Sequence, residues 1–442
     1  MKDTIVALAT PPLKSALAII RISGSNALTF AEKLMQKDFS HIKKRDIVYG
    51  KLYDNEDVVD EVIALVYVAP FSYTGENVVE LITHGSMLIV NQIIELLLRL
   101  GARLAGPGEF TSRAFINQKL DLVQAEAVNE LINATTKEAK NLALLSLDGE
   151  ASSYVHELKK EIGDLLSLIE VNIDYPEYED IEQANKELVL EKTDELLNKI
   201  DMYIHEGEQG KIIKEGIKVA IVGKPNVGKS SLLNALMDED KAIVTNIAGT
   251  TRDIVEGSIN LEGLTLNLLD TAGIRENVDK IENIGIDKAK KAIKEADLIL
   301  LLLDASSNLD KEDEKLLELT ADKKRIIIYN KADLAPYKKE GELYISALKK
   351  DIKPLKEAII AELNISEQSF NKASLASSRQ LALLKKAKES LEIVKEDALN
   401  GYPVDVISVN LFSAYNSVLE ILGEHNDFDL TEEIFSRFCV GK

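Results

Sequence analysis

The segment Gly223–Ser230 constrains the fold of this chain more than any other feature. It reads Gly-Lys-Pro-Asn-Val-Gly-Lys-Ser, with a strand-like apolar run before it and a helical pattern after it. A strand, a glycine-rich loop and a helix in this order form a P-loop, in which backbone N–H groups at a helix N-terminus surround a phosphate. Lys229 would bring positive charge to the β- and γ-phosphates, and the Ser230 hydroxyl would bind Mg²⁺. We therefore expect an α/β nucleotide-binding domain.

Three later motifs indicate which base the nucleotide carries. Asp270-Thr271-Ala272-Gly273 places an acid where it can hold a metal-bound water and a glycine N–H near the γ-phosphate. Asp333, in Asn330-Lys331-Ala332-Asp333, can accept two hydrogen bonds from guanine that adenine does not offer, so the wrong base is rejected. Ser346-Ala347-Leu348 would contact the guanine oxygen. The order and spacing resemble those of a small GTPase domain, and we predict GTP.

The chemistry of hydrolysis is expected to differ from that of Ras-like enzymes. Ile274 stands where those enzymes place the glutamine that orients the attacking water. The sequence shows no obvious arginine finger, but the side-chain oxygen of Asn226 could help to hold a monovalent cation beside the phosphates. We therefore hypothesise that K⁺ supplies the positive charge that an arginine finger supplies elsewhere.

The pattern of expected elements changes three times along the chain. Strand-like runs and helical patterns alternate before residue 118, which predicts an α+β domain. From 120 to 214, apolar residues at three- and four-residue spacing predict a long helical hairpin with an acidic face. From 217 the pattern predicts a mostly parallel sheet, and helices return after 364. The expected strands lie at 5–8, 18–22, 62–68, 218–222, 264–269, 298–303, 325–329 and 343–345, and the expected N-terminal helices at 25–35 and 86–100.

These patterns predict a multidomain α/β and α protein. We expect an N-terminal α+β domain at 1–118 and a discontinuous helical domain at 119–215 and 365–442. A Ras-like α/β P-loop GTPase domain at 216–364 would be inserted between its two parts, and the later helices would pack on the earlier ones.

Charge and composition limit the partners and the compartment. The net charge is −21, and residues 119–215 carry 10 basic against 23 acidic side chains. Such a surface does not hold nucleic acid by neutralising phosphates, so an RNA substrate would need a local basic patch or a partner protein. No apolar run approaches the ~20 residues of a membrane span. Cys439 is the single cysteine, and we expect a cytoplasmic protein without membrane attachment.

Several segments outside the P-loop carry a more specific resemblance. Gly249-Thr250-Thr251-Arg252-Asp253 lies between the P-loop and Asp270, and the C-terminal residues are Phe438-Cys439-Val440-Gly441-Lys442. With them, the chain resembles the MnmE (TrmE) family of tRNA modification GTPases throughout its length. The outer segments carry this identification because many proteins share GTPase motifs; they are Asp3–Ala7, Thr10–Pro12, Arg21–Gly24, Pro107–Phe110 and Lys119–Leu122.

The resemblance implies roles for residues of the GTPase domain. Thr251 would join Ser230 as a Mg²⁺ ligand, and Asn226, Thr245, Ile247 and Thr250 would bind K⁺. Glu282 would orient the catalytic water through a second water, acting with Lys229 and Asp270; without the resemblance, Glu282 would be interpreted as a solvated charge on a helix. The implied GTP-binding residues are Asn226, Val227, Gly228, Lys229, Ser230, Ser231, Thr245, Asn246, Ile247, Ala248, Gly249, Thr250, Thr251, Asp270, Thr271, Ala272, Gly273, Asn330, Lys331, Asp333, Ser346, Ala347 and Leu348.

The resemblance also implies a folate site and a homodimer built through the N-terminal domain. Arg21, Glu80, Lys119 and Lys442 match the folate-contacting positions, because cations suit the glutamate carboxylates of folate and an acid suits its aminopyrimidine edge. Taken alone, Arg21 and Lys119 would be interpreted as surface charges. Cys439 would lie near the folate site as a catalytic residue, whereas a lone cysteine is most often a small buried hydrophobe. Leu13–Leu17 replaces a glycine-rich stretch of the relatives.

By the resemblance, the chain acts with a flavin-dependent partner, MnmG (GidA), on the wobble uridine of certain tRNAs. The one-carbon unit would come from 5,10-methylene-tetrahydrofolate, of which 5-formyl-tetrahydrofolate is an analogue, and FAD would be bound by the partner. One alternative is a GTP-dependent switch in ribosome assembly, although such a factor should carry a basic RNA-binding module. Another is a folate enzyme with a regulatory GTPase domain, which would differ only in its substrate.

Overall fold

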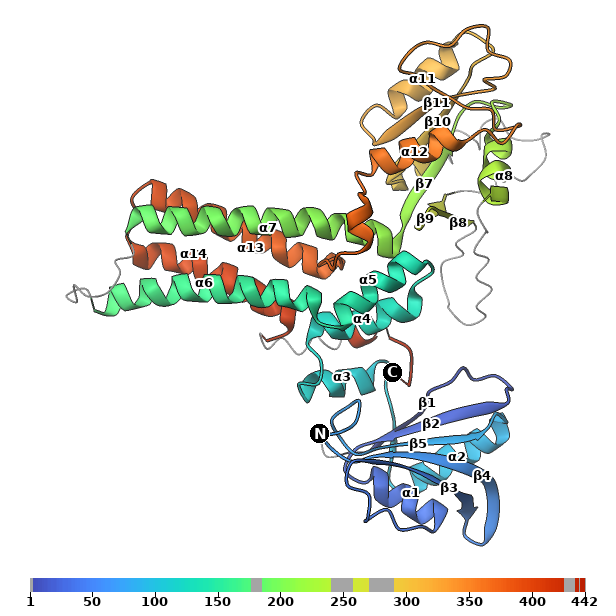
Figure 1. Cartoon of the computed structure of the whole chain (residues 1–442), viewed down its shortest axis with the longest axis vertical. Helices are drawn as coiled ribbons and strands as arrows, with labels where there is room; N and C mark the ends of the chain where they lie inside the picture. Colours follow the sequence, from blue (N-terminus) through green and yellow to red (C-terminus); the bar gives the residue numbers. More distant parts are fainter. Residues whose placement is uncertain are drawn as a thin grey trace. The chain divides into compact units, whose positions relative to one another are not determined.

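The computed structural model describes residues 3–175, 185–239, 257–269, 290–424, 434–436 and 438–441. The chain forms two compact units, and each is built from several segments of the sequence. The first comprises Met1–Asn129, Ser152–Gly163 and Tyr415–Lys442, and the second comprises Glu130–Ala151 and Asp164–Ala414. Figure 1 shows both units and labels most of their helices and strands.

The first unit is built on a six-stranded sheet. Its strand order is β3-β4-β5-β2-β1-β6, and all neighbours are antiparallel except β1 and β6. The strands expected at 5–8, 18–22 and 62–68 are confirmed as β1, β2 and β4, whereas β3, β5 and the short β6 were not predicted. The strands are β1 Ile5–Leu8, β2 Leu17–Ser23, β3 Arg45–Asp54, β4 Asp57–Tyr67, β5 Val78–His84 and β6 Arg103–Leu104.

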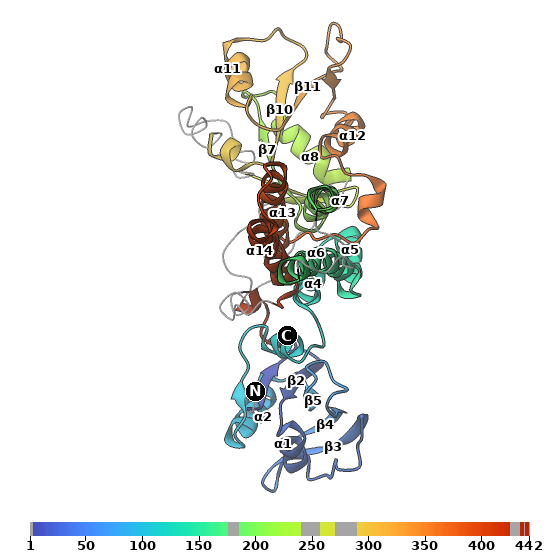
Figure 2. The same ribbon diagram turned by 90° about the vertical axis from the view of Figure 1, so that its left-hand side faces the viewer.

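Two helices, α1 (Ala27–Met35) and α2 (Met87–Arg99), cover one face of this sheet. Because side chains alternate between the faces of a strand, Ile20 and Ile22 of β2 enter the core beneath the helices while Arg21 lies on the other face. Both expected N-terminal helices are thus confirmed, and Figure 2 shows them beside the strands from a second direction. The sheet therefore presents alternate residues of β2 and β5 away from the helices.

The C-terminal residues belong to the same unit as this sheet. Phe435 and Phe438 are buried against Leu122 and Ala125 of α4. A backbone bridge joins Pro107 to Val440 just before α3. In this unit α3 is Glu109–Ile116 and α4 is Leu122–Asn133. The C-terminal segment is therefore folded together with the N-terminal sequence.

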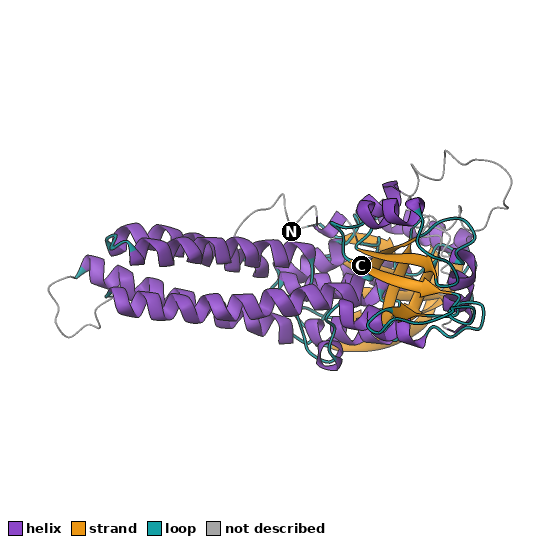
Figure 3. Ribbon diagram, turned by 90° about the horizontal axis from the view of Figure 1, so that it is seen from above, coloured by secondary structure: helices purple, strands orange, loops and turns teal. Residues whose placement is uncertain are grey.

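Long helices form one part of the second unit. α7 and α13 lie side by side (Figure 1), which confirms that a C-terminal helix packs on an earlier one. Figure 3 shows the long helices in purple. A Cβ on Gly210 of α7 would lie 2.0 Å from Ser374 Oγ, so glycine lets the chain before α13 approach the helix closely. α7 is Lys186–Glu215 and α13 is Ser378–Leu399. The other helices with residues in this unit are α5 Lys137–Leu147, α6 Glu150–Asp174 and α14 Val404–Leu422, of which α6 and α14 also have residues in the first unit.

The helical hairpin predicted for 120–214 is only partly correct. The described residues of this region form four helices. α4 ends at Asn133, and the Thr136 side chain accepts a hydrogen bond from the Ala139 N–H, which starts α5 as a separate helix. The acidic face is also partly neutralised, since Lys388 and Lys395 of α13 pair with Asp201 and Asp194 of α7 at 2.7 and 2.6 Å.

An α/β sheet of order β12-β11-β10-β7-β9-β8 forms the other part of this unit. All neighbouring strands are parallel except β8 and β9. The mostly parallel sheet is confirmed, and only β8 was not predicted. Its elements are β7 Ile217–Val222, β8 Ser258–Leu261, β9 Leu264–Leu268, β10 Leu298–Asp304, β11 Arg325–Asn330 and β12 Leu343–Tyr344, with α8 Lys229–Glu239, α11 Lys311–Leu319, α12 Lys353–Glu362 and the short 3₁₀ helix η1 Glu367–Phe370.

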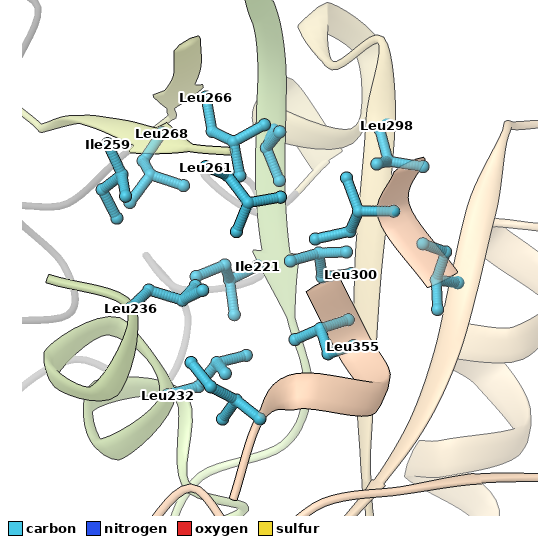
Figure 4. Packing of buried hydrophobic residues seen from close by; sticks show 14 of the residues in the cluster. Ile221, Leu232, Leu236, Ile259, Leu261, Leu266, Leu268, Leu298, Leu300 and Leu355 are labelled. Carbon is cyan, nitrogen blue, oxygen red and sulfur yellow. The ribbon is translucent and has the colours of Figure 1, made fainter. Parts of the chain in front are cut away.

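The core of this α/β part fixes the strand from which the P-loop begins. Figure 4 shows Ile221 of β7 and Leu300 of β10 pointing toward Leu232 of α8 and Leu355 of α12. All six residues of Leu298–Leu303 are buried, as expected for a strand covered on both faces. Among the described helices, none combines the length and the apolar composition that a bilayer-spanning segment needs.

Candidate functional site

The P-loop has the predicted geometry. β7 ends at Val222 and α8 begins at Lys229. Gly228 has φ 104°, which favours glycine, and a Cβ on it would lie 2.1 Å from Asn330 Nδ2. A Cβ on Gly223 would lie 2.7 Å from the carbonyl oxygen of Leu302. Both glycines are therefore required by close approach, and Ser230 and Ser231 follow in the first turn of the helix.

The ammonium of Lys229 lies against the backbone of the same loop. Its Nζ donates to the carbonyl oxygens of Gly223 at 2.7 Å and of Lys224 at 2.9 Å. Burial lowers the pKa of Lys229. Phosphate oxygens are charged acceptors and bind an ammonium more strongly than neutral carbonyls do. The Lys229 ammonium can therefore exchange its carbonyl acceptors for a β- or γ-phosphate oxygen.

Asn330 joins the P-loop to the third motif. Its side chain is 2% exposed. Nδ2 donates to the Val227 carbonyl oxygen at 2.8 Å, and Oδ1 accepts from the Ala347 N–H at 3.0 Å. Residues from three separate sequence motifs, all predicted to bind the nucleotide, are thus brought together by one buried amide.

Hydrogen bonding favours the ionised form of Asp333, the acid predicted to recognise guanine. Ser346 Oγ donates to Asp333 Oδ1 at 2.7 Å, and this hydrogen bond is the main cause that lowers the pKa of Asp333. Lys349 Nζ lies 3.7 Å from Asp333 Oδ2. Lys331 has φ 65°, and its Nζ donates to Asp304 Oδ2 at 2.6 Å. An ionised Asp333 is the state that accepts hydrogen bonds from guanine.

Part of the predicted site lies outside the described residues. This holds for the assignments to GTP, Mg²⁺, K⁺ and the catalytic water within 240–256 and 270–289, and for one folate residue. They remain predictions: Thr245, Asn246, Ile247, Ala248, Gly249, Thr250, Thr251, Asp270, Thr271, Ala272, Gly273, Glu282 and Lys442.

One group of charged residues beside the P-loop was not predicted from the sequence. Lys224 Nζ donates to Asp310 Oδ2 and to Asp313 Oδ2, at 2.8 Å each. The pattern Asp310-x-x-Asp313 is an N-terminal capping box of α11, which could have been recognised from its three-residue spacing. Asp304, the partner of Lys331, is the last residue of β10, and no sequence motif indicated its role.

The predicted folate residues Arg21 and Glu80 face each other across β2 and β5. Arg21 Nε donates to Glu80 Oε1 at 2.7 Å, and Nη1 donates to the Gly441 carbonyl oxygen at 3.0 Å. The guanidinium carbon lies 5.9 and 5.5 Å from the ring centres of Tyr73 and Phe110. The side chain of Arg21 is 19% exposed, so its interpretation as a surface charge is wrong.

The C-terminal motif reaches the same sheet. The Gly108 N–H donates to the Cys439 carbonyl oxygen at 3.3 Å. A Cβ on Gly441, which has φ 95°, would lie 2.6 Å from the Leu8 carbonyl oxygen. Cys439 is exposed, so the buried-hydrophobe interpretation of this cysteine is wrong. Lys119 is exposed and its Nζ donates to the Pro70 carbonyl oxygen at 3.2 Å, which is compatible with a surface charge.

The segment Leu13–Leu17, which leads into β2, is held by backbone hydrogen bonds. The Ser15 N–H donates to the Gly85 carbonyl oxygen at 3.1 Å, and the Gly85 N–H donates to the Ala16 carbonyl oxygen at 3.2 Å. Leu13 and Leu17 at its ends are exposed. The segment Leu13–Leu17 is therefore tied to the end of β5 without a glycine of its own.

Comparisons with known proteins agree with this geometry over the whole chain. The model of the MnmE helical domain matches residues 122–439, and that of the GTP-binding protein TrmE N-terminus matches residues 4–119. The tRNA modification GTPase MnmE of Streptococcus pyogenes serotype M12 (strain MGAS9429) is 42% identical over 456 residues, which cover 100% of this chain and 98% of that protein. The protein of the same name from Acholeplasma laidlawii (strain PG-8A) is 45% identical over 448 residues, covering 100% and 99%.

A solved structure, that of a variant of Aquifex aeolicus Era bound to GDP.AlF4-, is 26% identical and covers 39% of this chain and 66% of that chain. Its TM-score against this chain is 0.25. The matches at 42% and 45% identity span the whole chain, and the two family models together match residues 4–119 and 122–439. The chain belongs to the MnmE family of tRNA modification GTPases, enzymes that bind and hydrolyse GTP with Mg²⁺.

Proposed function

We propose that this GTPase acts with the flavoprotein MnmG on the wobble uridine of certain tRNAs. The two proteins install a carboxymethylaminomethyl or aminomethyl group at C5, in a heterotetramer or larger complex built on a homodimer of this chain. The single observation that carries the proposal is the bond from the Arg21–Glu80 pair to the C-terminal motif, Arg21 Nη1 to the Gly441 carbonyl oxygen at 3.0 Å.

This arrangement fits a tetrahydrofolate. Glu80 offers a carboxylate to the aminopyrimidine edge, and Arg21 offers a guanidinium to a carboxylate of the ligand. The ring of Tyr73 beside Arg21 offers an aromatic face to a flat heterocycle. Arg21, Glu80, Lys119 and Lys442 would hold the folate, and Cys439 would lie next to it. When bound, 5,10-methylene-tetrahydrofolate would supply the one-carbon unit, and the partner would supply FAD.

The sheet of the first unit also offers a surface for a homodimer. Ile47 and Tyr49 of the edge strand β3 are 69% and 61% exposed. In the register of the sheet Ile47 lies in one row with Glu80 and Arg21, so the apolar patch adjoins the proposed folate residues. Exposed apolar side chains on an edge strand are typical of a protein–protein interface. Ile47→Asp is expected to give a monomer in light scattering, and an unchanged mass would exclude this surface.

Hydrolysis is proposed to use K⁺ in place of an arginine finger. Asn226, Thr245, Ile247 and Thr250 would bind K⁺, Ser230 and Thr251 would bind Mg²⁺, and Glu282 would orient water. The described part of the site supports this with the positive φ of 61° at Asn226, which turns the P-loop backbone at the proposed K⁺ ligand. GTP turnover should be faster in K⁺ than in Na⁺, and equal rates would remove the cation from the mechanism.

The modification role is tested by nucleoside analysis of tRNA from a strain that lacks this gene. Wobble uridines should lose the C5 group, and the wild-type chain should restore it. Arg21→Leu should fail to restore it while keeping GTP hydrolysis, because Arg21 lies on the sheet of the first unit and not in the P-loop. Unchanged wobble uridines together with a ribosome defect would favour the ribosome-assembly alternative. The net charge of −21 further predicts weak tRNA binding without the partner.

A further inference from the structure

Lys224 lies inside the P-loop, yet its side chain points to another element. The side chain is 16% exposed, and Nζ donates to Asp310 Oδ2 and Asp313 Oδ2, at 2.8 Å each. These two acids are the N-cap residue and the third residue of α11. The ammonium therefore ties the phosphate-binding loop to the start of a neighbouring helix.

The buried carboxylate of Asp313 is stabilised by the Lys224 ammonium. Asp313 is 1% exposed, and its Oδ1 is buried with no hydrogen-bond partner among the described residues. Its Oδ2 accepts from Lys224 and, at 3.2 Å, from the Asp310 N–H. A buried carboxylate that loses its cation carries an uncompensated charge, which is strongly unfavourable. The position of Lys224 is therefore held firmly by α11.

The backbone of Lys224 carries this position to the nucleotide site. Its carbonyl oxygen accepts from Lys229 Nζ at 2.9 Å and from the Val227 N–H at 3.4 Å. Lys229 is the cation predicted to contact the phosphates. One residue thus bonds to α11 through its side chain and to the phosphate-binding lysine through its carbonyl group.

We propose that Lys224 is a positioning residue for GTP binding, which acts by clamping the P-loop to Asp310 and Asp313. The clamp sets where the loop N–H groups and Lys229 meet the phosphates, and it neutralises the two carboxylates at the start of α11. Contacts to the β-phosphate are made in both the ground state and the transition state. Loss of the clamp therefore raises KM and leaves kcat nearly unchanged.

The experiment measures GTP hydrolysis and binding of a fluorescent GDP by the full-length chain in K⁺ and Mg²⁺. Lys224→Met is expected to raise KM for GTP and Kd for GDP about tenfold, with kcat within twofold of wild type. Lys224→Arg should restore both, because a guanidinium also pairs with carboxylates. The matched control is Lys353→Met, which removes an exposed lysine paired with Glu357 at 3.9 Å on α12 and should change nothing.

A second variant separates binding from folding. If Lys224→Met does not fold, Lys224→Met combined with Asp313→Asn removes the uncompensated buried charge and should fold, with KM still raised. A folded variant of either kind with the KM of wild type would overturn the proposal. So would a fall in kcat at constant KM, or an Arg variant that behaves like the Met variant.

Discussion

Asn330 offers the sharpest test of how the nucleotide site is assembled. Its amide is 2% exposed and bonds to the Val227 carbonyl oxygen at 2.8 Å and to the Ala347 N–H at 3.0 Å. Asn330→Ala removes both bonds and leaves one backbone acceptor and one backbone donor without a partner. We expect this change to loosen the P-loop and the 346–348 loop together and to weaken GTP binding.

The magnitude follows from the two orphaned groups. A buried backbone group that loses its partner costs about 1–3 kcal/mol, so the pair costs roughly 2–6 kcal/mol. The lower end applies if water enters the space left by the amide and bonds to both groups. A loss of about 2 kcal/mol that falls on the binding conformation weakens GTP binding roughly 30-fold.

The assay is a fluorescence titration with a labelled GDP, accompanied by thermal unfolding. Asn267→Ala is a matched control, because the side chain of Asn267 also makes two hydrogen bonds, with Ser258 at 2.9 Å and Glu215 at 3.3 Å, away from the P-loop. It should lower stability slightly and leave the dissociation constant unchanged. A folded Asn330→Ala protein that binds GDP within threefold of wild type would refute the reasoning.

Three further predictions concern the first unit. Arg113→Met removes a 1% exposed cation that pairs with Asp3, Glu76 and Glu109, so urea unfolding should show a loss of about 3–5 kcal/mol. Burial raises the pKa of Glu109, but hydrogen bonds from Arg103, Gly106 and Arg113 outweigh it and hold the pKa below 4.5. The contribution of Glu109 to the free energy of unfolding is therefore complete above about pH 4.5 and is lost as the pH falls below it. In Glu109→Gln the free energy of unfolding should decrease less as the pH is lowered, measured by urea unfolding at several pH values. Gly441→Ala places a Cβ 2.6 Å from the Leu8 carbonyl oxygen, so it should abolish tRNA modification in the deletion strain while GTP turnover persists.

Much of the fold was accessible from local patterns. The strands at 218–222, 298–303 and 325–329 were predicted within a residue or two because parallel strands are continuous apolar runs. β3, β5, β6 and β8 were not predicted. β3 contains Gly50 and is exposed or half-buried along most of its length, so it lacks the continuous apolar run by which the buried strands were recognised. The two helices α4 and α5 were merged because their separation depends on one cap at Thr136.

The sequence by itself determined the chemistry of the nucleotide site, since a P-loop and its partner motifs are short segments whose residue types and spacing carry the function. Only the tertiary structure decided which groups meet. Arg21 bonds to a carbonyl group 420 positions away, Asn330 joins two loops, and Lys224 reaches α11. The physical reason is that periodicity encodes which face of an element is buried, whereas the partner of a polar group depends on where the packed core places distant segments.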